Sequence, residues 1–132
     1  MTDEKSVREP GAAIRRKVLG AAYTDAAAKN RNAFNADFQD FTIDTVWGGI
    51  WTRGVFEPRQ RSMLTIAILA AMGKDDELKM HVKASVNTGL SREEVKEILL
   101  HVAVYAGFPA GNTGTRIAGQ AYAEIDAAAK TP

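Results

Sequence analysis

The fold class is set by residues 58–89, which read PRQRSMLTIAILAAMGKDDELKMHVKASVNTG. Apolar side chains recur every three or four positions in the first half of this stretch, a spacing typical of an α-helix. Pro58 suits the first turn of that helix, and Gly73 suits a left-handed residue that ends it. Asp75 then places negative charge where a second helix begins. We therefore predict two consecutive helices, of which the first is apolar nearly all round and buried at the centre of the fold.

Helical patterns flank this stretch on both sides. Ser91 and Glu94 have the spacing of a capping box, which predicts the start of a further helix. Asn35 is expected to cap a helix that Gly48 and Gly49 end. We predict an all-α chain of about six helices. The expected helices are residues 12–30 (one or two pieces interrupted near Gly20), 36–47, 58–73, 75–89, 91–106 and 112–129, with a loop at residues 51–54.

The composition predicts one domain and no strongly charged partner. The chain has 132 residues, of which 45% are hydrophobic and 25% charged, the balance of a globular domain with a single core. We expect one domain over residues 1–132, with residues 1–11 as a flexible arm. The formal net charge of +1 gives no field that attracts nucleic acid or an anionic membrane. The expected partners are therefore small molecules or other protein chains.

Three absences narrow the function further. The sequence has no cysteine, which excludes disulfides, thiolate metal sites and thiol redox chemistry. Residues 1–10 are polar and charged, unlike a secretory signal, so a cytoplasmic location is expected. The longest apolar run, residues 63–72, is about half of the roughly 20 residues that span a bilayer, so we expect no membrane partner.

Lys74, Glu77 and His81 are spaced by three and then four residues, which places them on one side of the second helix. A glutamate one turn before a histidine can orient the ring, favour its protonated form and assist proton transfer. Spacing alone favours a simpler interpretation, an ordinary pair on a helix surface. The functional interpretation therefore needs further support.

Glu97, His101 and Tyr105 form a second polar stripe, at intervals of four on the helix that Ser91 opens. They stand among apolar residues, so their polar groups need partners. They are either satisfied core or interface residues or contacts to a ligand. Neither histidine belongs to a His-x-x-x-His pair or a carboxylate triad, so we expect no metal site.

Arg53 and Arg61 flank the start of the apolar helix. Guanidinium groups and the free backbone amides of a helix start can together hold a carboxylate. Arg59 lies in the same basic stretch, but no neighbouring residue suggests a function for it. We expect it to be a solvated surface group, as most single arginines are, and use it for comparison with Arg53 and Arg61. A dicarboxylate ligand would suit the pair.

Several segments together resemble the carboxymuconolactone decarboxylase family in their order and spacing, over nearly the whole chain. These segments are Trp51-Thr52-Arg53, Arg61-Ser62, Thr65-Ile66-Ala67, residues 77–81 (ELKMH), residues 87–89 (NTG) and residues 101–109 (HVAVYAGFP). The resemblance implies an alkylhydroperoxidase D-like helical domain that assembles as a homo-oligomer, often a trimer or hexamer. It also lowers the weight of the surface-pair interpretation of Glu77 and His81.

The wider superfamily includes thiol peroxidases, in which a glutamate is followed by a Cys-x-x-Cys-x-x-x-His motif. Alignment on His81 places the two cysteines at Lys74 and Glu77 and the glutamate at Ser62. Peroxidase chemistry of that type cannot operate here, and the retained histidine implies that the same pocket serves another reaction. The chain departs from closer relatives at residues 54–57 (GVFE), where Pro-Gly-Leu and an acidic residue are common.

The resemblance implies decarboxylation of 4-carboxymuconolactone to the β-ketoadipate enol-lactone, a step of protocatechuate catabolism. It implies no cofactor, because the lactone carbonyl of the substrate accepts the electrons that carbon dioxide leaves behind. The alternatives are a decarboxylase or lactone-processing enzyme of the same fold for a related acid, and a non-catalytic oligomer that binds a ligand.

Residue roles follow from the same resemblance. Arg53 or Arg61 is expected to anchor a carboxylate of the substrate. His81 is expected to protonate the intermediate or stabilise its oxyanion, and Glu77 to orient His81 or relay its proton. Secondary substrate contacts are expected from Ser62, Lys74, His101 and Tyr105.

Overall fold

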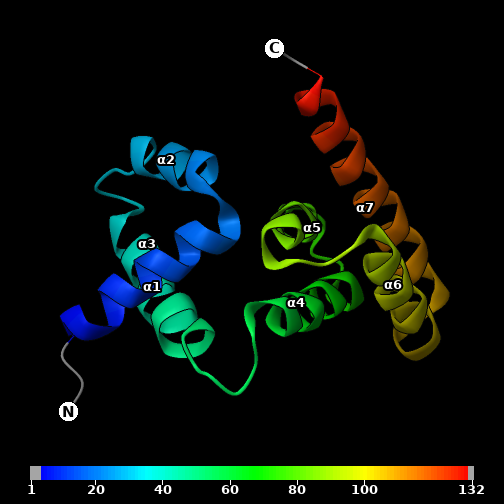
Figure 1. Ribbon diagram of the computed structural model, residues 1–132, viewed down its shortest axis with the longest axis horizontal. Helices are drawn as coiled ribbons and strands as arrows, with labels where there is room; N and C mark the ends of the chain where they lie inside the picture. Colours follow the sequence, from blue (N-terminus) through cyan, green and yellow to red (C-terminus); the bar gives the residue numbers. More distant parts are fainter. Residues whose placement is uncertain (1–3, 131–132) are drawn as a thin grey trace. The chain divides into compact units, whose positions relative to one another are not determined.

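The computed structural model describes residues 4–130, and these residues form helices joined by short connections (Figure 1). There is no strand among them, so the all-α prediction is confirmed. No helix in this range is both long and apolar enough to cross a membrane. The helices are α1 (Glu4–Leu19), α2 (Ala21–Lys29), α3 (Ala36–Thr42), the π-helix η1 (Ile43–Trp51), α4 (Pro58–Met72), α5 (Asp75–Thr88), α6 (Arg92–Ala106) and α7 (Phe108–Ala129).

The chain divides into two compact units after Pro58. In the first unit, α1 packs directly on η1, and their backbones meet at two glycines (Figure 1). A Cβ atom on Gly48 would lie 2.4 Å from the carbonyl oxygen of Val7, and one on Gly11 would lie 2.7 Å from the backbone nitrogen of Gly48. Only glycine fits where two helix backbones approach this closely. The crossing therefore depends on both glycines.

The prediction of a flexible arm at residues 1–11 is wrong for residues 4–11, which belong to α1. Residues 1–3 lie outside the described range. Contacts with η1 explain the difference, because the Arg8 guanidinium donates two hydrogen bonds to the Asp44 carboxylate, at 3.0 and 2.7 Å. Pro10 lies inside the helix, where it lacks the usual N–H donor. Contacts with η1 thus stabilise a helix where the polar local sequence predicts flexible chain.

The helix expected at residues 36–47 continues to Trp51 and changes from α to π geometry at Ile43. Gly48 does not end it, because this glycine serves the close contact with α1 and has no positive φ. Asn35 does precede α3, but its side chain makes no capping hydrogen bond. Its Oδ1 instead accepts from the backbone N–H of Asn32 at 2.8 Å.

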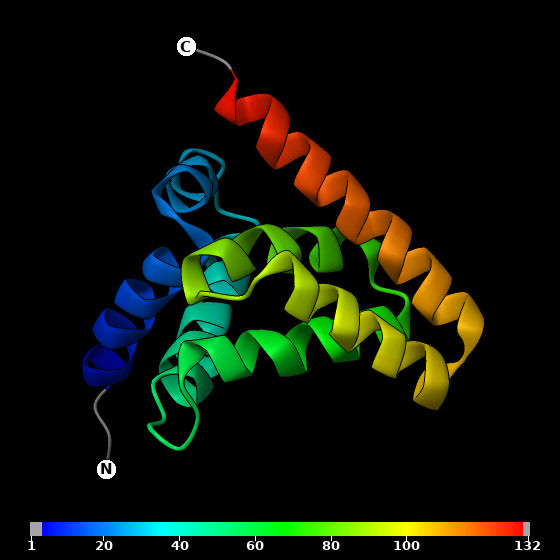
Figure 2. The same ribbon diagram turned by 45° about the vertical axis from the view of Figure 1, so that its right-hand side comes forward.

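The second unit contains α4 to α7, which run in alternating directions along the chain (Figure 2). Their apolar faces enclose one core. Arg92 of α6 lies over the Tyr122 ring of α7 at 4.5 Å and pairs with Asp126 at 2.6 Å. The fully or nearly fully buried core residues are Ile66, Ala70, Leu78, Val82, Leu90, Val95, Leu99, Val102, Ile117, Ala118 and Ala121.

The expected boundaries of the second unit are largely confirmed. Gly73 has a φ of +70° just after α4, and Gly89 has a φ of +90° just after α5, as left-handed terminators do. Ser91 and Glu94 form the predicted capping box at the start of α6. The last helix begins at Phe108, earlier than expected, because Pro109 is tolerated in a first turn.

One expectation about α4 is wrong. The helix buries only one side, along Ser62, Ile66 and Ala70. Leu64 and Ile68, on another side, are each about half exposed in the single chain. An apolar run therefore marks α4 as a helix but does not make it the centre of this bundle.

Candidate active site

The predicted pair Glu77 and His81 lies on the first two turns of α5. Glu77 is exposed, whereas His81 is only 9% exposed and ranks with the buried residues of the bundle. Burial lowers the pKa of His81 from 6.5 to about 4, and the charge of Glu77 acts in the opposite direction as the smaller effect. The glutamate thus favours the imidazolium as expected, but burial dominates and keeps the ring neutral at neutral pH.

Lys74 occupies the turn between α4 and α5. Its backbone N–H donates to the Leu69 carbonyl at 3.0 Å, and its own carbonyl accepts from the N–H of Leu78 at 2.8 Å. Its side chain is exposed. Lys74, Glu77 and His81 therefore follow one another at the start of α5, with the two charged groups towards solvent and the imidazole inside.

Ser62 is completely buried on α4. Its Oγ lies 2.8 Å from the Oγ1 of Thr88, the last residue of α5, at hydrogen-bond distance. Helices α4 and α5 have 15 and 14 residues and are joined by a tight turn, so the beginning of one meets the end of the other. Thr88 follows His81 on α5 by two turns, roughly 10 Å along the helix axis. The Ser62 hydroxyl therefore meets the end of α5 and does not lie at the level of His81.

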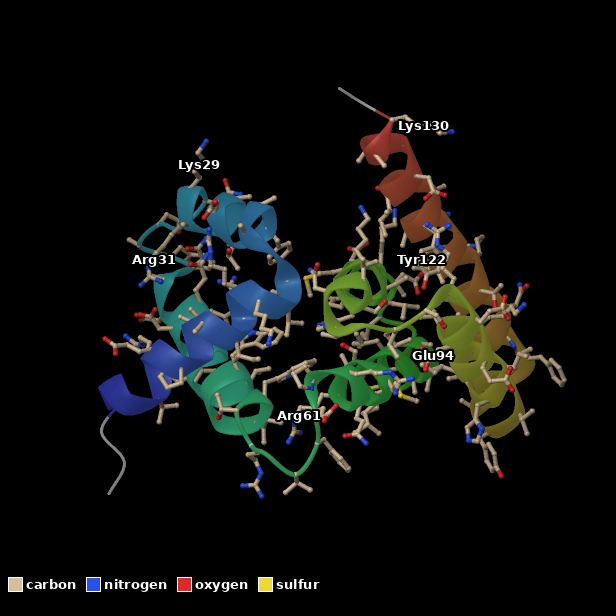
Figure 3. The ribbon with its side chains drawn as sticks, viewed as in Figure 1. Lys29, Arg31, Arg61, Glu94, Tyr122 and Lys130 are labelled. Atoms are coloured by element: carbon tan, nitrogen blue, oxygen red, sulfur yellow. The ribbon has the colours of Figure 1, made fainter. Side chains whose placement is uncertain are left out.

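The two candidate arginines belong to different units. Arg53 is exposed and lies in the connection that follows η1, in the first unit. Arg61 is half-buried in the first turns of α4 and shares the second unit with His81 (Figure 3). Of the two, Arg61 is thus the one that a continuous helical hairpin connects to the buried histidine.

Arg59 is not the solvated comparison that the sequence suggested. Its guanidinium pairs with the carboxylate of Glu94 on α6. Glu94 also accepts a hydrogen bond from the backbone N–H of Ser91 at 3.0 Å, so one carboxylate closes the α6 cap and holds the start of α4. Figure 3 labels Glu94 on α6.

His101 and Tyr105 lie on the exposed side of α6. Their rings stack with centroids 4.8 Å apart, and Tyr105 is 80% exposed. The opposite side of α6 enters the core through Leu99 and Val102. Within one chain, His101 and Tyr105 therefore face away from the core of the bundle.

The aromatic residues of η1 are buried. Trp47 and Trp51 have ring centroids 4.8 Å apart and an interplanar angle of 38°. No group of three or more His, Cys, Asp or Glu side chains within the described range is arranged to hold a metal ion.

Sequence reasoning missed Thr88 and Glu94 as partners of the site. Thr88 lies in a segment typical of a helix end, and Glu94 belongs to a capping box. These local roles already explain why each residue is present, so neither local pattern pointed to a second contact. Their second contacts depend on which helices become neighbours. The similar lengths of the two helices around Gly73 are the one signal that points to a contact of Ser62 with Thr88.

Fold and site define an all-helical protein in which a helical hairpin carries a buried neutral histidine beside an exposed glutamate. Comparison with known proteins identifies the group more closely: the model of the Carboxymuconolactone decarboxylase family matches residues 36–120, and the chain belongs to this family. The resemblance found in the sequence is thereby confirmed.

Two relatives agree with this assignment. The chain is 38% identical over 125 residues to the 4-carboxymuconolactone decarboxylase of Acinetobacter baylyi, which covers 95% of this chain and 92% of the relative. It is 33% identical over 101 residues to a nitrosuccinic acid decarboxylase of Metarhizium robertsii, which covers 76% of this chain and 71% of the relative. Both relatives are named as decarboxylases, which are carboxy-lyases.

Proposed function

We propose that this chain is a carboxy-lyase that converts 4-carboxymuconolactone to the β-ketoadipate enol-lactone without a cofactor. The observation that carries the proposal is 38% identity to a 4-carboxymuconolactone decarboxylase across nearly the full length of both chains. The family match at residues 36–120 includes parts of both compact units, which supports a single functional domain. A cytoplasmic location stays a prediction from the sequence.

The substrate provides its own electron sink. The departing carboxylate sits on a ring carbon that a double bond conjugates to the lactone carbonyl. When that carbon–carbon bond breaks, the electron pair delocalises onto the carbonyl oxygen and carbon dioxide leaves. The resulting oxyfuran anion then takes a proton on the ring carbon next to the carbonyl. The protein must therefore hold the second carboxylate, stabilise an oxyanion and supply one proton.

His81 is the proposed group for the oxyanion and the proton. As a neutral ring it can donate one N–H hydrogen bond to the developing oxyanion. A bound dicarboxylate adds negative charge beside it, which raises its pKa and lets it take up the proton that it then delivers. Glu77 is exposed one turn away and is the proposed route for that proton from solvent.

Arg61 is the proposed anchor for the carboxylate that the substrate retains. It lies in the first turns of α4, where a guanidinium and helix-start amides together favour an anion. Arg53 is the alternative anchor, on the connection after η1. Lys74 is the proposed secondary contact to the substrate, because its exposed side chain lies near Glu77 at the start of α5. Ser62 is fully buried against Thr88, and His101 and Tyr105 lie on the outer side of α6, so none of these three is proposed as a contact within one chain.

The test of the function is a direct assay of the purified chain with 4-carboxymuconolactone. The proposal expects loss of the ultraviolet absorbance of the conjugated lactone together with release of one carbon dioxide per substrate. Absorbance loss without carbon dioxide would point to lactone processing instead. Ligand binding without either change would point to a non-catalytic oligomer, and both outcomes contradict the proposal.

A second candidate substrate is nitrosuccinic acid, because a relative 33% identical over 71% of its own length is named for its decarboxylation. The two acids share one chemical feature: each gives a carbanion that delocalises onto oxygen, the lactone carbonyl in one and the nitro group in the other. Measuring kcat/KM for both acids with the same preparation separates the candidates. We expect the lactone to be the better substrate.

We also propose that the protein is a homo-oligomer, a trimer or hexamer. Large apolar side chains are exposed on the outer side of α6 and at the start of α7, among them Leu100, Val104 and Phe108, with 56 to 79% of each exposed. Exposed apolar surface that gathers on one part of a protein marks an interaction site. Sedimentation equilibrium should give three or six times the chain mass of 14.3 kDa, and a monomer would contradict the proposal.

A further inference from the structure

The first turn of α4 is held by contacts to two other helices. The first turn of any helix has backbone amides without intrahelical partners and tends to fray. Here Arg59 pairs with Glu94 of α6, and the Ser62 hydroxyl bonds to the Thr88 hydroxyl of α5. Arg61 lies between these two attachment points in the sequence.

The two attachments differ in strength. The side chains of Arg59 and Glu94 are 41% and 35% exposed, and ion pairs that water reaches contribute little. Ser62 is fully buried, so its hydroxyl loses its hydrogen-bond partner at full cost if Thr88 is changed. The contact between hydroxyl groups is therefore the one that fixes the first turn of α4.

The hydrogen-bond directions are set by a third group. Thr88 Oγ1 donates to the Ser85 carbonyl within α5, at 3.3 Å. With that proton used, Ser62 is the donor in the 2.8 Å bond and Thr88 Oγ1 is the acceptor. A serine at position 88 can reproduce both bonds, whereas a valine of nearly the same shape can make neither.

We propose that Thr88 is a positioning residue which, through Ser62, holds the first turn of α4 and with it the guanidinium of Arg61. The role of Arg61 as the carboxylate anchor rests on the proposed function, but the attachment of α4 to α5 does not. Loss of the attachment lets the anchor move while His81 stays in the middle of α5. Substrate binding should therefore suffer more than the chemical step.

The experiment compares Thr88→Val, Thr88→Ser and Thr115→Val with the unchanged protein. Thr115 is the matched control, because its hydroxyl donates only to the Gly111 carbonyl of its own helix, at 2.8 Å. The readouts are KM and kcat for 4-carboxymuconolactone and amide hydrogen exchange at residues 62–65. Thermal unfolding is measured in parallel to show that each variant is folded.

We expect Thr88→Val to raise KM about threefold to tenfold, the range of one lost hydrogen bond, with kcat changed less than twofold. Exchange at residues 62–65 should become faster in Thr88→Val alone, and Thr88→Ser should restore both values. An unchanged KM, a failure of serine to restore it, or the same effect in Thr115→Val overturns the proposal. If the unchanged protein does not turn over the lactone, the proposed function fails, and the exchange data alone decide whether Thr88 holds α4.

Discussion

His81 should make the stability of this protein depend on pH in a defined window. The pKa of this histidine is about 4 in the folded chain, against 6.5 for the ordinary side chain that the unfolded chain presents. Between these values the unfolded chain binds a proton that the folded chain does not, so stability rises with pH. The stability that the neutral His81 contributes is therefore fully present above about pH 6.5 and is lost as the pH falls towards 4.

The size of the effect follows from the two pKa values. One pH unit inside the window changes the unfolding free energy by up to about 1.4 kcal/mol, so the loss at pH 5 relative to pH 8 should be about 2 kcal/mol. The carboxylates with lowered pKa, such as Asp44 and Asp126, lose their protons well below pH 5 and lie outside this comparison.

The assay is urea unfolding followed by far-ultraviolet circular dichroism, which reports on the helices of both units, at pH 5, 6, 7 and 8. One protein concentration is used because the chain is expected to self-associate. In His81→Gln the dependence on pH should disappear, whatever the overall stability of that variant. In His101→Gln it should remain, because His81 is intact. Equal stability of the unchanged protein at pH 5 and 7, or the same slope in His81→Gln, would refute the buried neutral histidine.

Four further variants, one of them a control, test the helix packing and the α6 cap. Gly48→Ala should destabilise the chain by about 1 to 3 kcal/mol, since its Cβ would lie 2.4 Å from the Val7 carbonyl oxygen, whereas Gly54→Ala, with no atom within 4 Å, should be nearly neutral in the same thermal scan. Ser91→Ala should cost about 1 kcal/mol through the lost α6 cap. Leu78→Ala should cost about 2 to 5 kcal/mol in urea unfolding, and a loss under 1 kcal/mol would place Leu78 outside the core.

The helix boundaries of the second unit could be predicted well because short local sequence signals set them. Gly73 and Gly89 take the left-handed conformation that few other residues adopt, and the Ser91 capping box needs only four consecutive residues. The first unit was harder. Gly48 resembles a helix terminator, and only the path of α1 across η1 shows that it is needed for a close contact.

The candidate site shows the same division. The spacing of Glu77 and His81 predicts that both lie on one side of a helix, which the structure bears out. The neutral state of His81 could not be predicted, because the pKa depends on how deeply the helix packs and not on the neighbour one turn away. Likewise, the partner of Ser62 is 26 residues along the chain and follows from the pairing of two helices.

The central claim is that His81, with Glu77, carries out decarboxylation of 4-carboxymuconolactone. The most direct measurement is the rate of carbon dioxide release from this lactone by the unchanged protein, by His81→Ala and by Glu77→Gln, each first shown to be folded. We expect rapid release by the unchanged protein and a rate roughly 10² to 10⁴ times lower for His81→Ala, the usual contribution of a proton-transfer group. Folded His81→Ala and Glu77→Gln variants that keep the full rate would contradict the claim.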